Sequence, residues 1–447
     1  MQYHLITLGC QMNISDSERV VTVLNEMGMT RTEHEEEASL LGIVACSVRQ
    51  KAIDKVYSRI HKWNQWKAKK PLLTFVSGCI LPADREKFLK LFDLVFPMNE
   101  VPTLPEMIRQ NGIVTPMGLQ PASFESGISD FWKIAPKHHS GFEAFVPIQN
   151  GCDKFCTFCA VPYTRGREVS RPSDEILAEV KELISQGYKS ITLLGQNVNS
   201  YGLDKKGEEI EFHELLRSIG EYGKHSGKHF WTYFTSPHPR DMKPEVIDVI
   251  ASYPVLAKQI HLPLQSGDNM VLIHMNRKHK LEEYREIVSY IRKKLPTATL
   301  FTDIITGFSG ETDEQFSNTL KAVKEFQYNM AFVAVYSPRP GAVSSRWADD
   351  VPHHVKKERL HILNAEVEKS SLKYNQSLVG KTLQVLITDK DRKNEFLSGL
   401  TEGKINVRIA SSDESLIGNF VDIKITGAAE FSIAGEPVFA EKLEEIS

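Results

Sequence analysis

Three short apolar runs, each followed by a helix-like stretch, open the chain. Residues 5–9, 40–45 and 72–78 are apolar and contain β-branched side chains, which predicts buried strands. A fourth strand is expected at residues 94–96. Because strands that alternate with helices form parallel sheets, residues 1–120 are predicted to be an N-terminal parallel-sheet domain.

The middle of the chain repeats a strand and a helix. The predicted strands are 144–149, 190–195, 230–235, 259–264, 300–306 and 331–336, and the helices between them include 173–185, 281–294 and 312–326. Thr312 followed by Gln315 forms a capping box for the last helix. Six parallel units predict an open, partial (β/α)6 barrel over residues 138–375, with functional groups on the loops after the strands. The turn-rich residues 111–129 before it are expected to be a linker.

The pattern changes after a predicted helix at residues 354–377. Short alternating segments at 382–388, 406–409 and 420–425, separated by glycines, predict a small antiparallel β-barrel over residues 379–443. Such barrels often bind RNA. Residues 379–447 nevertheless carry eight Lys and Arg against twelve Asp and Glu, a net charge of −4, so composition does not indicate a basic groove. The predicted fold class is therefore α/β, with a parallel-sheet domain, a partial barrel and a small β-barrel.

Composition fits a soluble globular protein of about three domains. The chain has 447 residues, of which 41% are hydrophobic and 25% charged. It contains no run of 18 apolar residues and no basic start followed by an apolar stretch, so neither a membrane span nor a signal peptide is expected. A cytoplasmic location follows as the expectation, and there grouped cysteines more often bind metal than form disulfides. The net charge of −3 neither indicates nor excludes a nucleic-acid partner.

Half of the six cysteines form a Cys-x3-Cys-x2-Cys run: Cys152, Cys156 and Cys159. An iron–sulfur cube normally takes four cysteines, so three thiolates on one loop leave one iron free. This spacing, with an aromatic residue before the last cysteine, resembles the radical S-adenosylmethionine (SAM) enzymes, in which the open iron chelates SAM and passes it one electron. The alternative is a zinc knuckle, but zinc sites usually pair two short Cys or His motifs, and no fourth ligand has such spacing here.

The other half, Cys10, Cys46 and Cys79, stand at the ends of the first three predicted strands. In a parallel sheet all carboxyl ends lie along one edge, where ligands bind. These three cysteines should therefore converge and hold a second metal cluster. The alternative is that they are buried structural thiols, since free cysteine is often buried.

Longer segments extend the resemblance to radical SAM enzymes over nearly the whole chain. They are residues 8–13, 45–49, 77–79, 151–159, 161–172, 194–199, 261–267 and 337–341. With them the chain resembles the tRNA methylthiotransferase family of radical SAM enzymes, and its last part resembles that family's TRAM domain. Gln11-Met12-Asn13 favours the MiaB branch over the ribosomal-protein branch, whose equivalent segment is usually Pro-Lys-Asn. Ser309 departs from the family pattern, which usually has proline there.

The resemblance implies a substrate, two cofactors and partners. In the MiaB branch the substrate is tRNA with an isopentenylated adenosine, N6-(dimethylallyl)adenosine, beside the anticodon. The family uses two SAM molecules, one as radical source and one as methyl donor, and carries sulfur through the second of two 4Fe-4S clusters. The adenine C–H bond is not acidic, so no side-chain base can open it, and radical chemistry belongs to cofactors. An electron donor such as flavodoxin or ferredoxin is also implied.

Alternatives and weaker site assignments remain open at this point. Other possible substrates are a ribosomal-protein aspartate and threonylcarbamoyladenosine in tRNA, and a remote alternative is a non-catalytic, zinc-containing RNA-binding protein. Phe158 either packs on the adenine of SAM or fills its loop. The remaining candidates are Gly195, Gln196 and Asn197, which either contact SAM or form an ordinary turn, and Arg165, Arg167 and Arg171, which either contact tRNA phosphates or form a solvated face.

Overall fold

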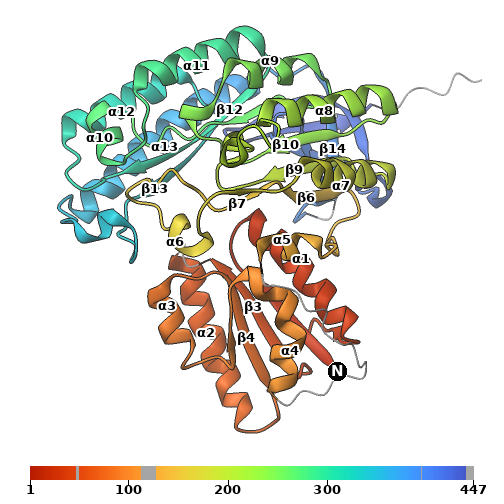
Figure 1. The fold of residues 1–447 in the computed structure, drawn as a ribbon. Helices are drawn as coiled ribbons and strands as arrows, with labels where there is room; N and C mark the ends of the chain where they lie inside the picture. Colours follow the sequence, from red (N-terminus) through yellow and green to blue (C-terminus); the bar gives the residue numbers. More distant parts are fainter. Residues whose placement is uncertain (47–49, 112–126, 394, 439–447) are drawn as a thin grey trace, which may run out of the picture.

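The computed structural model describes residues 1–46, 50–111, 127–393 and 395–438. An N-terminal unit, red and orange in Figure 1, lies below a larger central unit, and the C-terminal strands are drawn in blue. The predicted linker at 111–129 falls mostly outside the described residues, as do residues 47–49 after Cys46.

The N-terminal unit is the predicted parallel sheet. Its strands are β1 (Gln2–Thr7), β2 (Thr30–Arg31), β3 (Leu40–Cys46), β4 (Leu73–Cys79) and β5 (Leu94–Val95), in the order β2-β1-β3-β4-β5, and every neighbouring pair is parallel. Every residue of β3 and β4 is buried, because helices cover both faces of the sheet. Helices α1 (Gln11–Glu26) and α4 (Leu104–Gln110) pack on one face, and α2 (Gln50–Lys67) and α3 (Pro82–Phe88) pack on the other.

The central unit is an open arc of parallel strands. These are β6 (Glu143–Pro147), β9 (Ser190–Leu194), β10 (Trp231–Phe234), β11 (Gln259–His261), β12 (Thr299–Thr306) and β13 (Met330–Val335). They form two three-stranded sheets, β10-β9-β6 and β11-β12-β13, joined by an isolated parallel bridge between Thr232 and Leu256. The predicted partial barrel is therefore confirmed, with its weakest pairing at the middle.

Helices wrap the outside of this arc. They include α7 (Ser173–Ser185), α8 (Phe212–Ser226), α9 (Pro244–Ser252), α11 (Leu281–Lys294), α12 (Asp313–Phe326) and α13 (His353–Gln376). Thr312 is the N-cap of α12, and the capping box with Gln315 is present in both directions, which confirms the local prediction. In the described part of the chain, no helix combines the length and apolar character needed to cross a bilayer.

The C-terminal unit is a closed five-stranded barrel. Its strands are β14 (Thr382–Lys390), β15 (Leu397–Thr401), β16 (Asn406–Ile409), β17 (Phe420–Ala428) and β18 (Ser432–Pro437), in the order β14-β15-β16-β18-β17. The expectation of a wholly antiparallel barrel was wrong, because β16 and β18 pair in parallel. Strand directions cannot alternate around a closed ring of five, so one parallel pair is unavoidable.

The barrel packs against the amino ends of the central strands. The Trp231 ring at the start of β10 lies 4.5 Å from the Phe420 ring, measured between centroids. Thr299, the first residue of β12, donates its hydroxyl to the carbonyl oxygen of Gly403 at 2.7 Å. The barrel therefore lies at the end opposite to the carboxyl edge of the arc, where functional loops are expected.

Candidate active site

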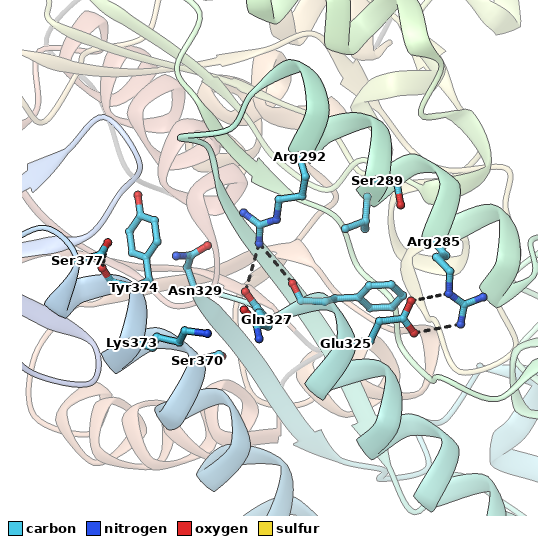
Figure 2. Close-up of a pocket in the computed structure, with 12 residues that line it drawn as sticks. Arg285, Ser289, Arg292, Glu325, Gln327, Asn329, Ser370, Lys373, Tyr374 and Ser377 are labelled. Carbon is cyan, nitrogen blue, oxygen red and sulfur yellow. Dashed lines mark hydrogen bonds and ion pairs between the residues drawn. The ribbon is translucent and has the colours of Figure 1, made fainter.

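The cavity at the amino end of the arc is not the candidate site. It has a volume of about 480 Å³, and Figure 2 shows Arg285, Arg292 and Glu325 on its wall. Arg285 pairs with Glu325 at 2.5 and 3.1 Å, while Arg292 donates to main-chain carbonyls at the end of α12. No cysteine lines this cavity, so the metal chemistry predicted from the sequence must lie elsewhere.

The three N-terminal cysteines lie together at the carboxyl edge of the first sheet. Cys46 and Cys79 are register partners at the ends of β3 and β4, and Cys10 is the N-cap of α1. Gly9 lets the loop that carries Cys10 lie close to Cys46, because a Cβ added at Gly9 would lie 3.0 Å from the Cβ of Cys46. Gly78 has a φ of +111°, and a Cβ there would lie 2.2 Å from the carbonyl oxygen of Ala45, so the approach requires glycine.

Two polar residues that sequence reasoning missed support this cluster. Asn13 is fully buried, donates to the Ala45 carbonyl at 3.0 Å and accepts from Cys10 Sγ at 3.3 Å. Asp16, one turn further along α1, is also buried and pairs with Arg165. Asn13 belongs to the Gln11-Met12-Asn13 segment that carried the family resemblance, whereas the only signal of Asp16 was a polar residue at a position that a helix packed on a sheet would normally fill with an apolar one.

The Cys10 and Cys79 thiols have raised pKa values and are protonated in the metal-free protein. Burial, followed by the charge of Cys79, raises the pKa of Cys10. A hydrogen bond with Cys46, together with burial, raises the pKa of Cys79 well above its usual value, although Arg165 opposes the shift. Because metals bind thiolates, a metal centre here would have to displace these protons.

The second cysteine loop follows β6 and the two-residue strand β7 (Gln149–Asn150) at the carboxyl edge of the central arc. Cys152 and Cys156 are buried, and burial raises the pKa of Cys152 to about 11 and that of Cys159 to about 12. Gly151 has a φ of +79°, and a Cβ there would lie 2.0 Å from the carbonyl oxygen of Arg167. The tight start of the loop therefore depends on this glycine.

Each cysteine set has a buried arginine beside one sulfur. Arg165 Nε donates to Cys79 Sγ at 2.9 Å, and Arg277 Nη1 donates to Cys156 Sγ at 3.5 Å. Buried negative charge needs a counter-charge, so both arginines suit a cluster held by thiolates. Among the described residues, no three Cys, His, Asp or Glu side chains could hold a single metal ion.

A buried polar network extends from the second cysteine loop across the carboxyl edge. Ser200 Oγ donates to Glu168 Oε1 at 2.5 Å and accepts from Gln149 Nε2 at 3.1 Å. Asn197 Nδ2 donates to Asp241. Several buried atoms of this region have no partner: Gln149 Oε1, Glu168 Oε2, Asn197 Oδ1, His238 Nε2, Arg277 Nε and His279 Nε2. Because buried polar atoms normally bind something, this set fits a polar ligand next to Cys156.

Burial shifts the pKa values of three side chains in this region: Glu168, His238 and His279. Desolvation raises the pKa of Glu168 to about 7, although Ser200 donates to its carboxylate. Desolvation and the nearby positive charge of Arg277 lower the pKa of His238 and of His279, the latter to about 4. Both imidazoles are therefore neutral at physiological pH. His238 Nδ1 accepts from the Arg240 N–H, so its unpartnered Nε2 can only donate, whereas His279 Nδ1 donates to the Arg277 carbonyl oxygen, so its unpartnered Nε2 can only accept.

Family models cover all three units of the chain. Residues 146–323 match the radical SAM superfamily, residues 376–438 match the TRAM domain, and residues 2–97 match a family described as uncharacterized protein family UPF0004. Proteins named tRNA-2-methylthio-N(6)-dimethylallyladenosine synthase match almost end to end. The one from Vibrio parahaemolyticus is 37% identical over 98% of this chain and 92% of its own, and the one from Chromobacterium violaceum is 38% identical over 98% and 99%.

The chain belongs to the tRNA methylthiotransferase family of radical SAM enzymes. It is therefore a transferase of a superfamily that uses an iron–sulfur cluster and SAM. Solved structures agree on the fold. The radical SAM methyltransferase TsrM from Kitasatospora setae superimposes with a TM-score of 0.55 at 12% identity, covering 76% of this chain and 74% of that one. The cobalamin-dependent radical SAM enzyme OxsB gives 0.52 at 12% identity, covering 80% and 56%.

In this methylthiotransferase, the residues predicted to contact SAM lie around the cysteine loop and its polar network. Gln196 Oε1 accepts from the Gly151 N–H at 2.5 Å, so it supports the cysteine loop directly. A Cβ on Gly195 would lie 3.0 Å from Gln149 Oε1. Asn197 is buried with an unpartnered Oδ1, and Phe158 packs edge-on against Phe308. Direct contact of these residues with SAM stays a prediction.

The three arginines predicted to contact tRNA have different environments. Arg167 is exposed, with 74% of its side chain accessible, and pairs with Asp153. Arg171 is buried and pairs with Glu175 and Glu179 on α7. The Arg165 side chain is buried, pairs with Asp16 and donates to Cys79 Sγ. Contact with tRNA phosphates stays a prediction for all three arginines, although the guanidinium groups of Arg165 and Arg171 already bind protein carboxylates.

Proposed function

We propose that this methylthiotransferase converts N6-(dimethylallyl)adenosine beside the anticodon of tRNA into its 2-methylthio derivative. The end-to-end similarity to proteins named for that synthase activity carries the proposal. The contact of Arg165, which follows the second cysteine loop, with Cys79 of the first cysteine set supports it, because sulfur insertion needs a radical source and a sulfur carrier close to one base. Two SAM molecules are consumed per product, one as radical source and one as methyl donor.

Six cysteines are proposed to hold two 4Fe-4S clusters. Cys152, Cys156 and Cys159 would hold the SAM-binding cluster, and Cys10, Cys46 and Cys79 would hold the auxiliary cluster. When bound, the first supplies the electron that cleaves SAM, and the second supplies sulfur. The protein would hold both clusters in fixed positions and exclude water from them. Burial of four of the six cysteines supports this role: Cys46, Cys79, Cys152 and Cys156.

The unpartnered polar atoms next to Cys156 are proposed to bind SAM. Asn197 and Glu168 would receive the donor groups of its amino-acid and ribose parts, and His238 would bind as a neutral imidazole because burial lowers its pKa. Gln196 would act indirectly, since its amide oxygen is already used by Gly151. Phe158 would contact the adenine. A pKa of about 7 leaves Glu168 able to accept or donate a hydrogen bond there.

Transfer RNA is proposed to reach both ends of the central unit. The proposed domain boundaries divide the chain into units at 1–120, 138–375 and 379–443. The last unit packs at the amino ends of the central strands, remote from the cysteines. It would therefore contact the tRNA body rather than the target base. Arg167, exposed beside the cysteine loop, would meet the phosphates near that base. A flavodoxin or ferredoxin is the proposed electron donor.

Two measurements test this function. Anaerobically reconstituted protein should contain about eight irons with matching labile sulfide, and about four after Cys152, Cys156 and Cys159 are all replaced by alanine. In tRNA digests from a strain that lacks the gene, mass spectrometry should show loss of methylthio-isopentenyladenosine, restored by the wild-type chain. Unchanged methylthio-isopentenyladenosine would reject the substrate. Loss of methylthio-threonylcarbamoyladenosine, or of a methylthio group on a ribosomal protein, would identify that molecule as the substrate instead.

A further inference from the structure

Arg165, which follows the second cysteine loop in the chain, contacts the first cysteine set through its side chain. It ends the short helix α6 (Val161–Arg165), which begins two residues after Cys159 and lies between the N-terminal and central units (Figure 1). From there its guanidinium reaches the first sheet. Nε donates to Cys79 Sγ at 2.9 Å, and Nη2 donates to Asp16 Oδ2 at 2.5 Å.

A third contact fixes the arginine from its own domain. Nη1 donates to Asn150 Oδ1 at 3.2 Å, and Asn150 returns a hydrogen bond from Nδ2 to the Arg165 carbonyl at 2.9 Å. The planar guanidinium is thus held on three sides, by a cysteine, a carboxylate and an amide. Lysine could not reproduce this, because its ammonium is a single point charge without a rigid fork.

Burial makes this contact unlike a surface ion pair. The Arg165 side chain is 6% exposed and that of Asp16 is 1% exposed. Burying such a pair costs desolvation free energy, so it is weak evidence for stability and better evidence for a specified geometry. Arg165 also lines a cavity of about 420 Å³ between the two units, together with Gly78 and Asn150, whereas Cys79 does not line it. The arginine therefore also limits access from this cavity to the sulfur.

We propose that Arg165 is a positioning residue that fixes the auxiliary cluster relative to the SAM-binding cluster and raises the reduction potential of the auxiliary one. The proposal rests on the cluster assignments of the proposed function. Hydrogen bonds to cluster sulfurs are among the features that set the potential of iron–sulfur clusters, and removing a cationic donor lowers it. Because Arg165 ends the short helix that begins two residues after Cys159, its contact with Cys79 also ties the position of the auxiliary cluster to the second cysteine loop.

Potential is measured on the auxiliary cluster alone. The full-length chain with Cys152, Cys156 and Cys159 replaced by alanine is reconstituted anaerobically and titrated electrochemically, followed by electron paramagnetic resonance. Adding Arg165→Gln should shift the potential downward and change the spectrum, and Arg165→Lys should give a smaller shift. Arg171→Gln is the matched control, because it removes an equally buried, ion-paired arginine that contacts no cysteine. It should leave potential and spectrum unchanged.

The coupling of SAM cleavage to product formation is measured in the chain with all six cysteines present. Arg165→Gln should still cleave SAM, but methylthio product per SAM cleaved should fall by on the order of a hundredfold, as expected for a misplacement of ~1 Å. Arg165→Gln could instead lose the auxiliary cluster while it keeps its fold and about four irons. That result would show that Arg165 holds Cys79 in place. The reduction potential of the auxiliary cluster is then measured in Arg165→Lys.

Unchanged potential, spectrum and coupling in Arg165→Gln with full iron would overturn the proposal and leave the proposed function intact. A wild-type chain that binds both clusters but makes no methylthio product would reject the proposed function, while the potential measurement would still decide the role of Arg165.

Discussion

Replacing Gly78 with alanine should remove the auxiliary cluster without changing any cysteine. The backbone there has a φ of +111°, and the new Cβ would lie 2.2 Å from the Ala45 carbonyl oxygen and 2.8 Å from its nitrogen. Ala45 belongs to β3, which carries Cys46, so relief of this clash separates the strand ends that bring Cys46 and Cys79 together.

The magnitude follows from two contributions. A left-handed backbone costs an L-residue about 1–2 kcal/mol, and overpacking a tight site costs about 1–3 kcal/mol, so the local cost is about 2–5 kcal/mol. Gly187→Ala separates these contributions. Gly187 has a φ of +96°, but a Cβ there meets nothing within 4 Å, so only the backbone contribution applies.

The assay combines iron and labile-sulfide content with thermal unfolding of the anaerobic protein. Gly78→Ala should retain about four irons and normal SAM cleavage, whereas Gly187→Ala should retain about eight. The melting temperature of Gly78→Ala should fall below that of Gly187→Ala. Full iron content in Gly78→Ala, with a melting temperature equal to that of the control, would refute the view that this glycine sets the spacing of the cysteines.

Four other predictions concern the division of labour, titration, the last unit and one unusual residue. Cys156→Ala should lose reductive SAM cleavage, while Cys46→Ala should cleave SAM without inserting sulfur; normal cleavage in Cys156→Ala would reject the open-iron assignment. The pKa of Glu168 is raised from 4.5 to about 7 by burial, so its stabilising contribution is full below pH 4.5 and is lost as pH rises toward 7. Unfolding of the metal-free protein should therefore show about 3 kcal/mol of pH-dependent stability that is missing in Glu168→Gln, and parallel curves for the two proteins would contradict this. Deleting residues 379–447 should leave both clusters in place and weaken tRNA binding only modestly, measured by filter binding, because the segment has a net charge of −4; a loss of iron would speak against a separable unit. Ser309→Ala should raise thermal stability by about 1 kcal/mol, because the buried Ser309 hydroxyl has no hydrogen-bond partner; a lower melting temperature would show that the hydroxyl is used.

Local sequence signals determined the elements and the kinds of chemistry. Helices α7 and α11 have the predicted bounds, and Thr312 with Gln315 marked the start of α12, because apolar periodicity and capping depend on residues within one or two turns. The placement of Cys46 and Cys79 at neighbouring strand ends also followed, since parallel strands end at one edge.

Only the tertiary structure decided which partners these elements meet. Arg165 looked like a candidate phosphate contact, yet it pairs with Asp16, 149 residues away, and with Cys79. Arg277 beside Cys156 gave no sequence signal at all. The parallel pairing of β16 with β18 came from closing five strands into a ring. A charged residue has the same local signal whether it faces water or a buried sulfur, because that choice is made when separately formed surfaces pack together.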